Sequence, residues 1–236
     1  MKLNHSLALV AGFSAALQVA TAGNITGTVT LNGTPPPEKE ITPLIEDATC
    51  GKLVEGKPTT HFFVVGANKG LADVIVMLKG ISGKSTGASA APVTIDQKGC
   101  QYSPSISAIQ TGQKINVKNS DPVMHNIHTI PSVDGNKEMN PSQMAGAADL
   151  TFTFDKPENF LKFKCDVHPW MFAWVTVVDH PYFALTDKDG KFTIKNVPAG
   201  KYTVTALHRK AAATGVDKEV EVKDADVTAD FTLEVK

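Results

Sequence analysis

A cysteine, a histidine and a methionine that can all bind metal lie close together in the sequence, at Cys165, His168 and Met171. A second histidine, His125, stands well upstream of them. One thiolate, two imidazoles and a weak thioether form the ligand set that suits a single copper ion cycling between Cu(I) and Cu(II). Zinc is matched less well, because structural zinc sites bring paired cysteines or histidines and catalytic sites bring three strong ligands with an open position. The pattern therefore predicts a mononuclear copper site.

Each of these residues also has a structural alternative. An isolated cysteine is often a buried thiol, a methionine often fills a core, and His125 could be a satisfied core histidine. Chance explains the spacing poorly, because composition alone would produce Cys-x2-His-x2-Met roughly 0.002 times in a chain of this make-up. The joint spacing therefore favours metal binding over packing.

Alternating apolar and polar residues predict the strands that must hold these side chains. The run LKFKC puts Leu161, Phe163 and Cys165 on one face of a strand, so Cys165 is expected to point inward at the end of that strand. His125 comes just after the strand-like run INVKN. His168, followed by a proline and a tryptophan, is expected at the surface edge of the site, with an apolar patch around it.

Short β-rich runs recur along the rest of the chain, and after the first 22 residues no segment shows helical periodicity over three turns. The sequence therefore predicts an all-β fold. The small, polar run SGKSTGASAA at 82–91 is expected to be a linker. Near the C-terminus, a strand, an Asp/Gly-rich turn and a second strand at 184–194 predict a β-hairpin.

Charge and the N-terminus limit the classes of function. The formal net charge is −1, from 23 basic and 24 acidic residues without blocks of one sign, so neither nucleic acid nor an anionic membrane surface is an expected partner. Residues 1–22 read as a signal peptide with cleavage after Ala22. No other apolar run approaches membrane length, so no membrane insertion is expected. The mature chain is expected to be periplasmic or secreted.

Residues 89–179 resemble the cupredoxins, the type I blue copper proteins, on the motifs VTIDQKGCQYSPSISAIQTGQKINVKNSDPVMHNIH, LTFTF, FKCDVHPWM and WVTVV. Among cupredoxins they are most similar to the amicyanin and plastocyanin-like group. The resemblance implies a Greek-key β-sandwich in which Asn126 ties the two ligand loops together. Trp170 stands where amicyanin carries a phenylalanine, which leaves the partner open. The residues that would hold the copper are His125, Cys165, His168 and Met171.

The flanking sequences resemble a carboxypeptidase regulatory-like, prealbumin-type sandwich, on ITGTVTLNG near the start and ALTDKDGKFTIKNVPAGKYTVTA near the end. This implies a second, smaller and discontinuous β-sandwich made of residues 23–88 and 180–236, with the cupredoxin inserted. The alternative is two independent terminal pieces. Three cysteines in an exported chain favour one disulfide and one thiol with another role. We predict that Cys50 and Cys100 pair and join the two sandwiches; the alternative is two reduced thiols.

The sequence predicts an electron carrier that works by outer-sphere transfer. Its cofactor would be one type I copper per chain, and its partners would be redox proteins. The resemblance implies a dehydrogenase as donor and a c-type cytochrome as acceptor. No Ser/His/Asp set, phosphate loop or pair of carboxylates at useful spacing appears, so no enzyme activity is expected. Two alternatives stay open, a periplasmic copper chaperone or storage protein and a β-sandwich binding module without metal.

Overall fold

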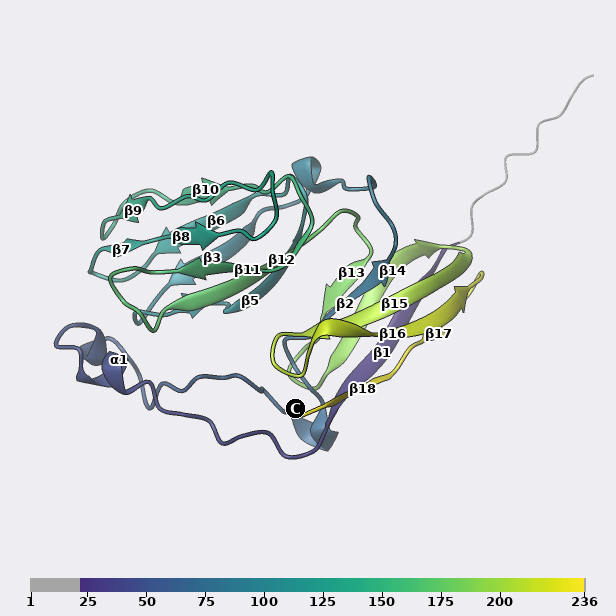
Figure 1. Ribbon diagram of the computed structural model, residues 1–236, viewed down its shortest axis with the longest axis horizontal. Coiled ribbons are helices and arrows are strands. Elements are labelled where there is room, and N and C mark those ends of the chain that lie inside the picture. The colour runs from purple at the N-terminus through teal and green to yellow at the C-terminus, as the bar shows by residue number, and fades with distance from the viewer. Residues whose placement is uncertain (1–21, 236) are drawn as a thin grey trace, which may run out of the picture.

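The structure is a computed structural model that describes residues 22–235. Its strands confirm the all-β prediction, since the described helices are one five-residue α-helix and three short 3-10 helices. The predicted signal peptide, residues 1–22, lies outside the described residues except for Ala22. Among the helices that the structure does describe, none has the length and apolar character to cross a membrane. The strands form two β-sandwiches, drawn to the right and left in Figure 1.

The outer sandwich is built from both ends of the chain. One of its sheets runs in the order β14-β1-β17, with β18 also paired to β1, and the other in the order β13-β2-β15-β16. Both β17 and β18 run parallel to β1, so the C-terminal strands complete a sheet begun by the N-terminal strand. The strands are β1 (Ala22–Asn32), β2 (Ile75–Lys79), β13 (Phe183–Leu185), β14 (Lys191–Pro198), β15 (Gly200–His208), β16 (Ala212–Val222), β17 (Val227–Thr228) and β18 (Phe231–Glu234).

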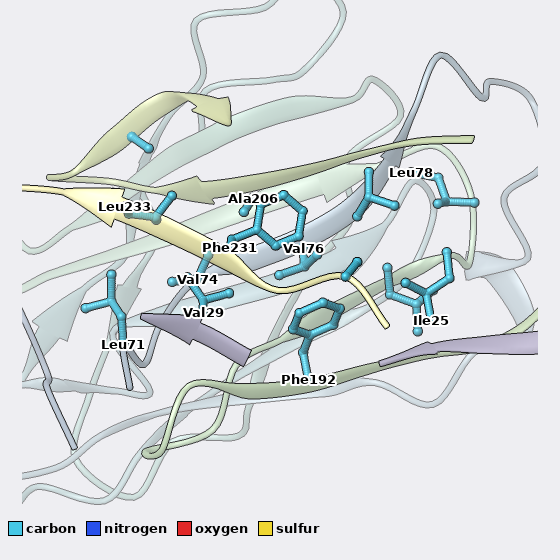
Figure 2. Close-up of a cluster of buried hydrophobic side chains, with 14 of the residues drawn as sticks. Ile25, Val29, Leu71, Val74, Val76, Leu78, Phe192, Ala206, Phe231 and Leu233 are labelled. Atoms are coloured by element: carbon cyan, nitrogen blue, oxygen red, sulfur yellow. The ribbon is translucent and has the colours of Figure 1, made fainter. Parts of the chain in front are cut away.

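Apolar and polar residues alternate along these strands, and the apolar side chains of the two sheets face each other. Along β1 the side chains of Ile25, Val29 and Leu31 are buried, and Figure 2 shows Phe192 and Phe231 packed among residues of the opposite sheet. The period of two residues in each strand puts these side chains on the inner face and leaves threonines and lysines outside. The outer sandwich therefore has a hydrophobic core of its own.

The predicted hairpin at 184–194 is wrong. The turn forms, since the N–H of Gly190 donates to the carbonyl of Asp187 at 2.9 Å. However, β13 pairs with β2 and β14 pairs with β1, so the two strands enter opposite sheets. Gly190 has φ +77°, and a Cβ on it would lie 2.2 Å from the carbonyl oxygen of Val29. Turn chemistry predicts a reversal of the chain but cannot tell which sheet each strand joins.

The inner sandwich contains the strands between 93 and 178. Its sheets run in the orders β10-β6-β3-β4 and β5-β12-β11-β8, with β7 and β9 forming a separate pair. The pairs β3–β6 and β5–β12 are parallel, so the strands do not simply follow each other in space. The strands are β3 (Val93–Gln97), β4 (Tyr102–Ser103), β5 (Ile106–Gln110), β6 (Ile115–Asn119), β7 (His125–Asn126), β8 (His128–Ile130), β9 (Ser142–Gln143), β10 (Leu150–Phe152), β11 (Glu158–Lys164) and β12 (Phe172–Val178).

Residues 33–66 form a long excursion between β1 and β2, which we call the arm. It contains α1 (Thr42–Glu46) and the 3-10 helix η1 (Cys50–Lys52), while the other 3-10 helices are η2 (Ala67–Lys69) and η3 (Gly87–Ser89). Figure 1 shows the arm leaving β1 and carrying α1 to the side of the inner sandwich, far from β1. Leu44 and Cys50 are fully buried and belong to the core of the inner sandwich, with Leu53 packed against it. The range 23–88 was assigned from sequence to the outer sandwich, but this end of the arm packs on the inner sandwich.

Candidate metal centre

Cys165 follows β11 directly and begins a short, closed loop that returns the chain to β12. The predicted alternation holds: Leu161, Phe163 and Cys165 are all buried, and Cys165 is 1% exposed. The N–H of Cys165 donates to the carbonyl of Met171 at 3.3 Å, and the N–H of Met171 donates to that of His168 at 2.9 Å. These two bonds fix the loop. Met171 is buried in the same core cluster as Cys165.

His125 comes from a different part of the inner sandwich. It lies on β7, which pairs with β9 opposite Gln143, and its side chain is fully buried. Its Nε2 lies 2.9 Å from Oδ2 of Asp121, which accepts the hydrogen bond. An Nε2 that donates to a carboxylate leaves Nδ1 as the atom free to accept a proton or a metal ion.

The structure brings the donor atoms of three of the four sequence-predicted residues together. Nδ1 of His125 lies 3.0 Å from Nδ1 of His168, and the latter lies 3.6 Å from Sγ of Cys165. One nitrogen of each ring and the sulfur all lie within 4.8 Å of one another. Two imidazole nitrogens and a thiol that converge in a buried place are a donor set for a soft or borderline metal ion such as copper.

The charges of these groups depend on one another. Burial opposes ionisation of Cys165, but hydrogen bonds from His125 and from the N–H groups of Asn126, His168 and Val167 outweigh it and lower the pKa of the thiol. Burial opposes protonation of His125, but Asp121 and Cys165 outweigh it and raise the pKa of His125 to about 8. The surroundings therefore shift Cys165 toward the thiolate and His125 toward the charged imidazolium, and a metal cation would supply the positive charge in place of a proton.

The surroundings of His168 favour its neutral form. Burial and the neighbouring charge on His125 lower the pKa of His168, while the carboxylates of Asp47 and Asp121 oppose this shift. A neutral imidazole is the form that binds a metal ion.

Asn126 joins the two loops that supply the donors. Its Oδ1 accepts a hydrogen bond from the N–H of Asp166 at 2.8 Å and lies 3.2 Å from Sγ of Cys165. Its Nδ2 donates to Oδ1 of Asn140 and, at 3.3 Å, to Oδ2 of Asp166. The carbonyl of Asn126 accepts from the hydroxyl of Tyr102 at 2.8 Å. The side chain predicted to tie the loops together thus lies between them.

Asp121 is a residue of the site that the sequence reasoning missed. Besides His125, its carboxylate accepts the N–H of Gly99 at 2.6 Å and that of Cys100 at 2.8 Å. Burial raises the pKa of Asp121, but these hydrogen bonds outweigh it and keep the pKa below its ordinary value. The signal was present, because an aspartate four residues before His125 stands in the motif DPVMH.

The expected exposure of His168 is wrong, since its side chain is only 9% exposed. The ring of Trp170 lies over it at a centroid distance of 5.3 Å, and Nε1 of Trp170 donates to the carbonyl of Cys100 at 3.0 Å. Cys100 forms a disulfide with Cys50 of the arm. Both sulfurs lie within 4.8 Å of a ring nitrogen of His168. The sequence motif places His168 in a turn, but it does not show that a remote segment covers it.

His128, given no metal role from sequence, lies outside this cluster. Its Nδ1 lies 2.9 Å from Oδ2 of Asp166 and its Nε2 lies 2.7 Å from Oε1 of Glu138. Both ring nitrogens thus have carboxylate partners, and His128 links two loops on the outside of the site.

Comparison with known proteins finds similarity in parts of the chain. The family described as the second β-sandwich domain of NOMO1-like subunits of the BOS complex matches residues 181–236, which cover β13 to β18. A search of curated proteins finds no match.

Three solved structures are similar to parts of this chain. The purple cupredoxin from Nitrosopumilus maritimus is 28% identical, with 36% of this chain and 98% of that one covered and a TM-score of 0.30. An oxidized mutant of amicyanin is 19% identical, with 43% and 97% covered and a TM-score of 0.32. The Cu-containing nitrite reductase (NirK) from Thermus scotoductus SA-01 is 23% identical, with 38% of this chain covered and a TM-score of 0.33. This chain spans only 23% of the length of that reductase.

Proposed function

We propose that this chain is a type I copper protein that carries single electrons between redox proteins. The observation that carries the proposal is the convergence of Nδ1 of His125, Nδ1 of His168 and Sγ of Cys165 at one buried place. Met171, buried beside them, would be the weak fourth ligand. Copper bound here would supply one-electron cycling between Cu(I) and Cu(II).

The residues around the donors favour electron transfer because they limit movement. Asp121 holds the far nitrogen of His125, Asn126 holds the loop of Cys165, and two backbone hydrogen bonds close that loop. Donors that keep their places in both oxidation states make electron exchange fast, since little rearrangement accompanies it. A strand-and-loop scaffold with buried ligands therefore suits a carrier better than a store that must release its metal.

The proposal includes the partners and the compartment. The chain would exchange electrons with proteins such as a dehydrogenase donor or a c-type cytochrome acceptor, and would carry out no catalysis of its own. It would work outside the cytoplasm, where a disulfide such as Cys50–Cys100 is stable.

The test is the visible absorption of the purified chain during titration with Cu(II). We expect an intense thiolate-to-copper band that saturates at one copper per chain and is lost and regained through one-electron reduction and reoxidation. Cys165→Ser should abolish the band. His128→Asn is the matched control, because it removes a histidine outside the cluster and should leave the band unchanged.

The same titration separates the alternatives. A copper chaperone or store would bind Cu(I) tightly without an intense Cu(II) band, and a binding module without metal would take up neither ion. If the wild-type chain stays colourless, or if Cys165→Ser keeps the band, the electron-carrier proposal is wrong.

A further inference from the structure

The arm between β1 and β2 has two legs that run back along each other. Its two legs pair with each other, with an isolated bridge between Glu40 and Thr59 and a hydrogen bond of 3.0 Å from the N–H of Thr60 to the carbonyl of Lys39. The carboxylate of Glu38 accepts the hydroxyl of Thr60 at 2.9 Å and the N–H of Phe62 at 3.0 Å. Within the described part of the chain, the hydrogen bonds of residues 38–62 all stay inside the arm.

Apolar contacts and one covalent bond hold the far end of the arm on the inner sandwich. Leu44 and Cys50 are fully buried in its core, and Ile41, Leu53 and Val54 pack against that core. The covalent bond is the disulfide from Cys50 to Cys100. Among the described residues, no hydrogen bond joins this end of the arm to the inner sandwich. Apart from apolar packing, the disulfide is therefore what connects the two.

The arm ends over the candidate metal centre. The sulfurs of Cys50 and Cys100 lie within 4.8 Å of a ring nitrogen of His168. With Trp170 beside it, this leaves His168 only 9% exposed, although the next residue, Pro169, is exposed. Without the arm, the sulfur of Cys50 would no longer lie against the ring of His168.

We propose that the arm is a cover, fastened by the Cys50–Cys100 disulfide, that closes the His168 side of the centre to solvent and to other proteins. This inference rests on the proposed function, because covering His168 affects electron transfer only when His168 is a copper ligand. Because both sulfurs are fully buried, a dithiol reductant would reach the disulfide during local opening of the arm, pass two electrons and two protons to it, and leave as a disulfide itself. Access of redox partners to His168 would then depend on the redox state of the two cysteines.

The test measures how fast diethylpyrocarbonate modifies each histidine of the copper-free chain, followed by peptide mass mapping. Cys50→Ser with Cys100→Ser releases the cover and, like the wild type, leaves Cys165 as the single free thiol. We expect modification of His168 to accelerate about tenfold or more, since each 1.4 kcal/mol removed from the cost of local opening is a factor of ten. His125, fully buried in the same sandwich, should stay protected.

A second variant tests the cover without relying on the disulfide. Replacing residues 40–59 by Asn-Gly joins the legs where Lys39 and Thr60 already pair, and Cys100→Ser removes the orphaned thiol. His168 should react at least as fast as in the double serine variant. Val175→Ala, in the inner core on β12, is the control for general loosening and should leave His168 slow.

The outcomes separate the possibilities. If His168 reacts at the wild-type rate in both variants, the arm is not a cover. If only the shortened arm exposes His168, the disulfide does not fasten it. If His125 accelerates with His168, or if Val175→Ala has the same effect, the sandwich itself has loosened and the inference is wrong. None of these measurements needs copper, so their outcome is independent of the metal-binding titration.

Discussion

Replacing Asp121 by asparagine should weaken copper binding and destabilise the inner sandwich together. The carboxylate of Asp121 accepts three N–H groups, from Gly99, Cys100 and His125. An asparagine of the same shape has one oxygen acceptor, and its amide group must face at least one of these donors. If the amide faces His125, it donates to Nε2 and moves the ring proton to Nδ1, the atom that faces the other donors.

The magnitude follows from these contacts. One buried backbone N–H left without an acceptor costs about 1–3 kcal/mol of unfolding free energy, and the loss of charge assistance in the remaining bond adds about 1 kcal/mol. Loss of the carboxylate that orients a metal-binding histidine weakens metal affinity about 10- to 100-fold. We therefore expect Asp121→Asn to raise the apparent dissociation constant for copper within that range.

The assay pairs a copper competition titration against a chelator with urea unfolding of the copper-free chain. Long-range nitrogen–proton NMR of the His125 ring reports which nitrogen carries the proton. Asp149→Asn is the control, because it makes the same change of charge on an exposed residue of the inner sandwich. An Asp121→Asn variant that keeps wild-type affinity, stability and ring tautomer would refute the assigned role of Asp121.

Two further predictions concern Asn126 and His208. Asn126→Ala removes the acceptor of the Asp166 N–H and should cost about 2 kcal/mol in urea unfolding; an unchanged midpoint would contradict the link between the loops. Burial and, to a smaller extent, the charge of Arg209 lower the pKa of His208 to about 4, and the Nδ1 of His208 accepts the N–H of Ala211. Between about pH 6.5 and 4, His208 takes up a proton in the unfolded chain but not in the folded chain. The free energy of unfolding should therefore fall by about 3 kcal/mol as the pH drops through that window. His208→Asn, which keeps an acceptor but cannot titrate, should lose this part of the pH dependence; an identical pH profile would contradict it.

Local patterns predicted the parts of the site that lie on regular strands. The alternation at 161–165 correctly turned Cys165 inward, because the two faces of a strand differ in burial. The spacing of His168 and Met171 after the cysteine places them in one short loop, which two backbone hydrogen bonds close. These features depend on residues that are neighbours in sequence.

Features that depend on distant segments could not be predicted in the same way. The hairpin at 184–194 failed because the choice of sheet is made by β1 and β2, far away in sequence. The exposure expected for His168 failed because Cys50 reaches it from the arm and the ring of Trp170 lies beside it. Few apolar residues lie between 33 and 60, and the prolines at 35–37 suggest an ordinary loop, so nothing local indicates that this segment packs on another sandwich.

Anomalous diffraction at the copper absorption edge, from crystals of the chain grown with copper, would locate the metal directly. We expect one strong peak per chain, bounded by Nδ1 of His125, Sγ of Cys165 and Nδ1 of His168. A peak elsewhere, for example between His128 and Glu138, or no peak from a folded chain with a free Cys165, would contradict it.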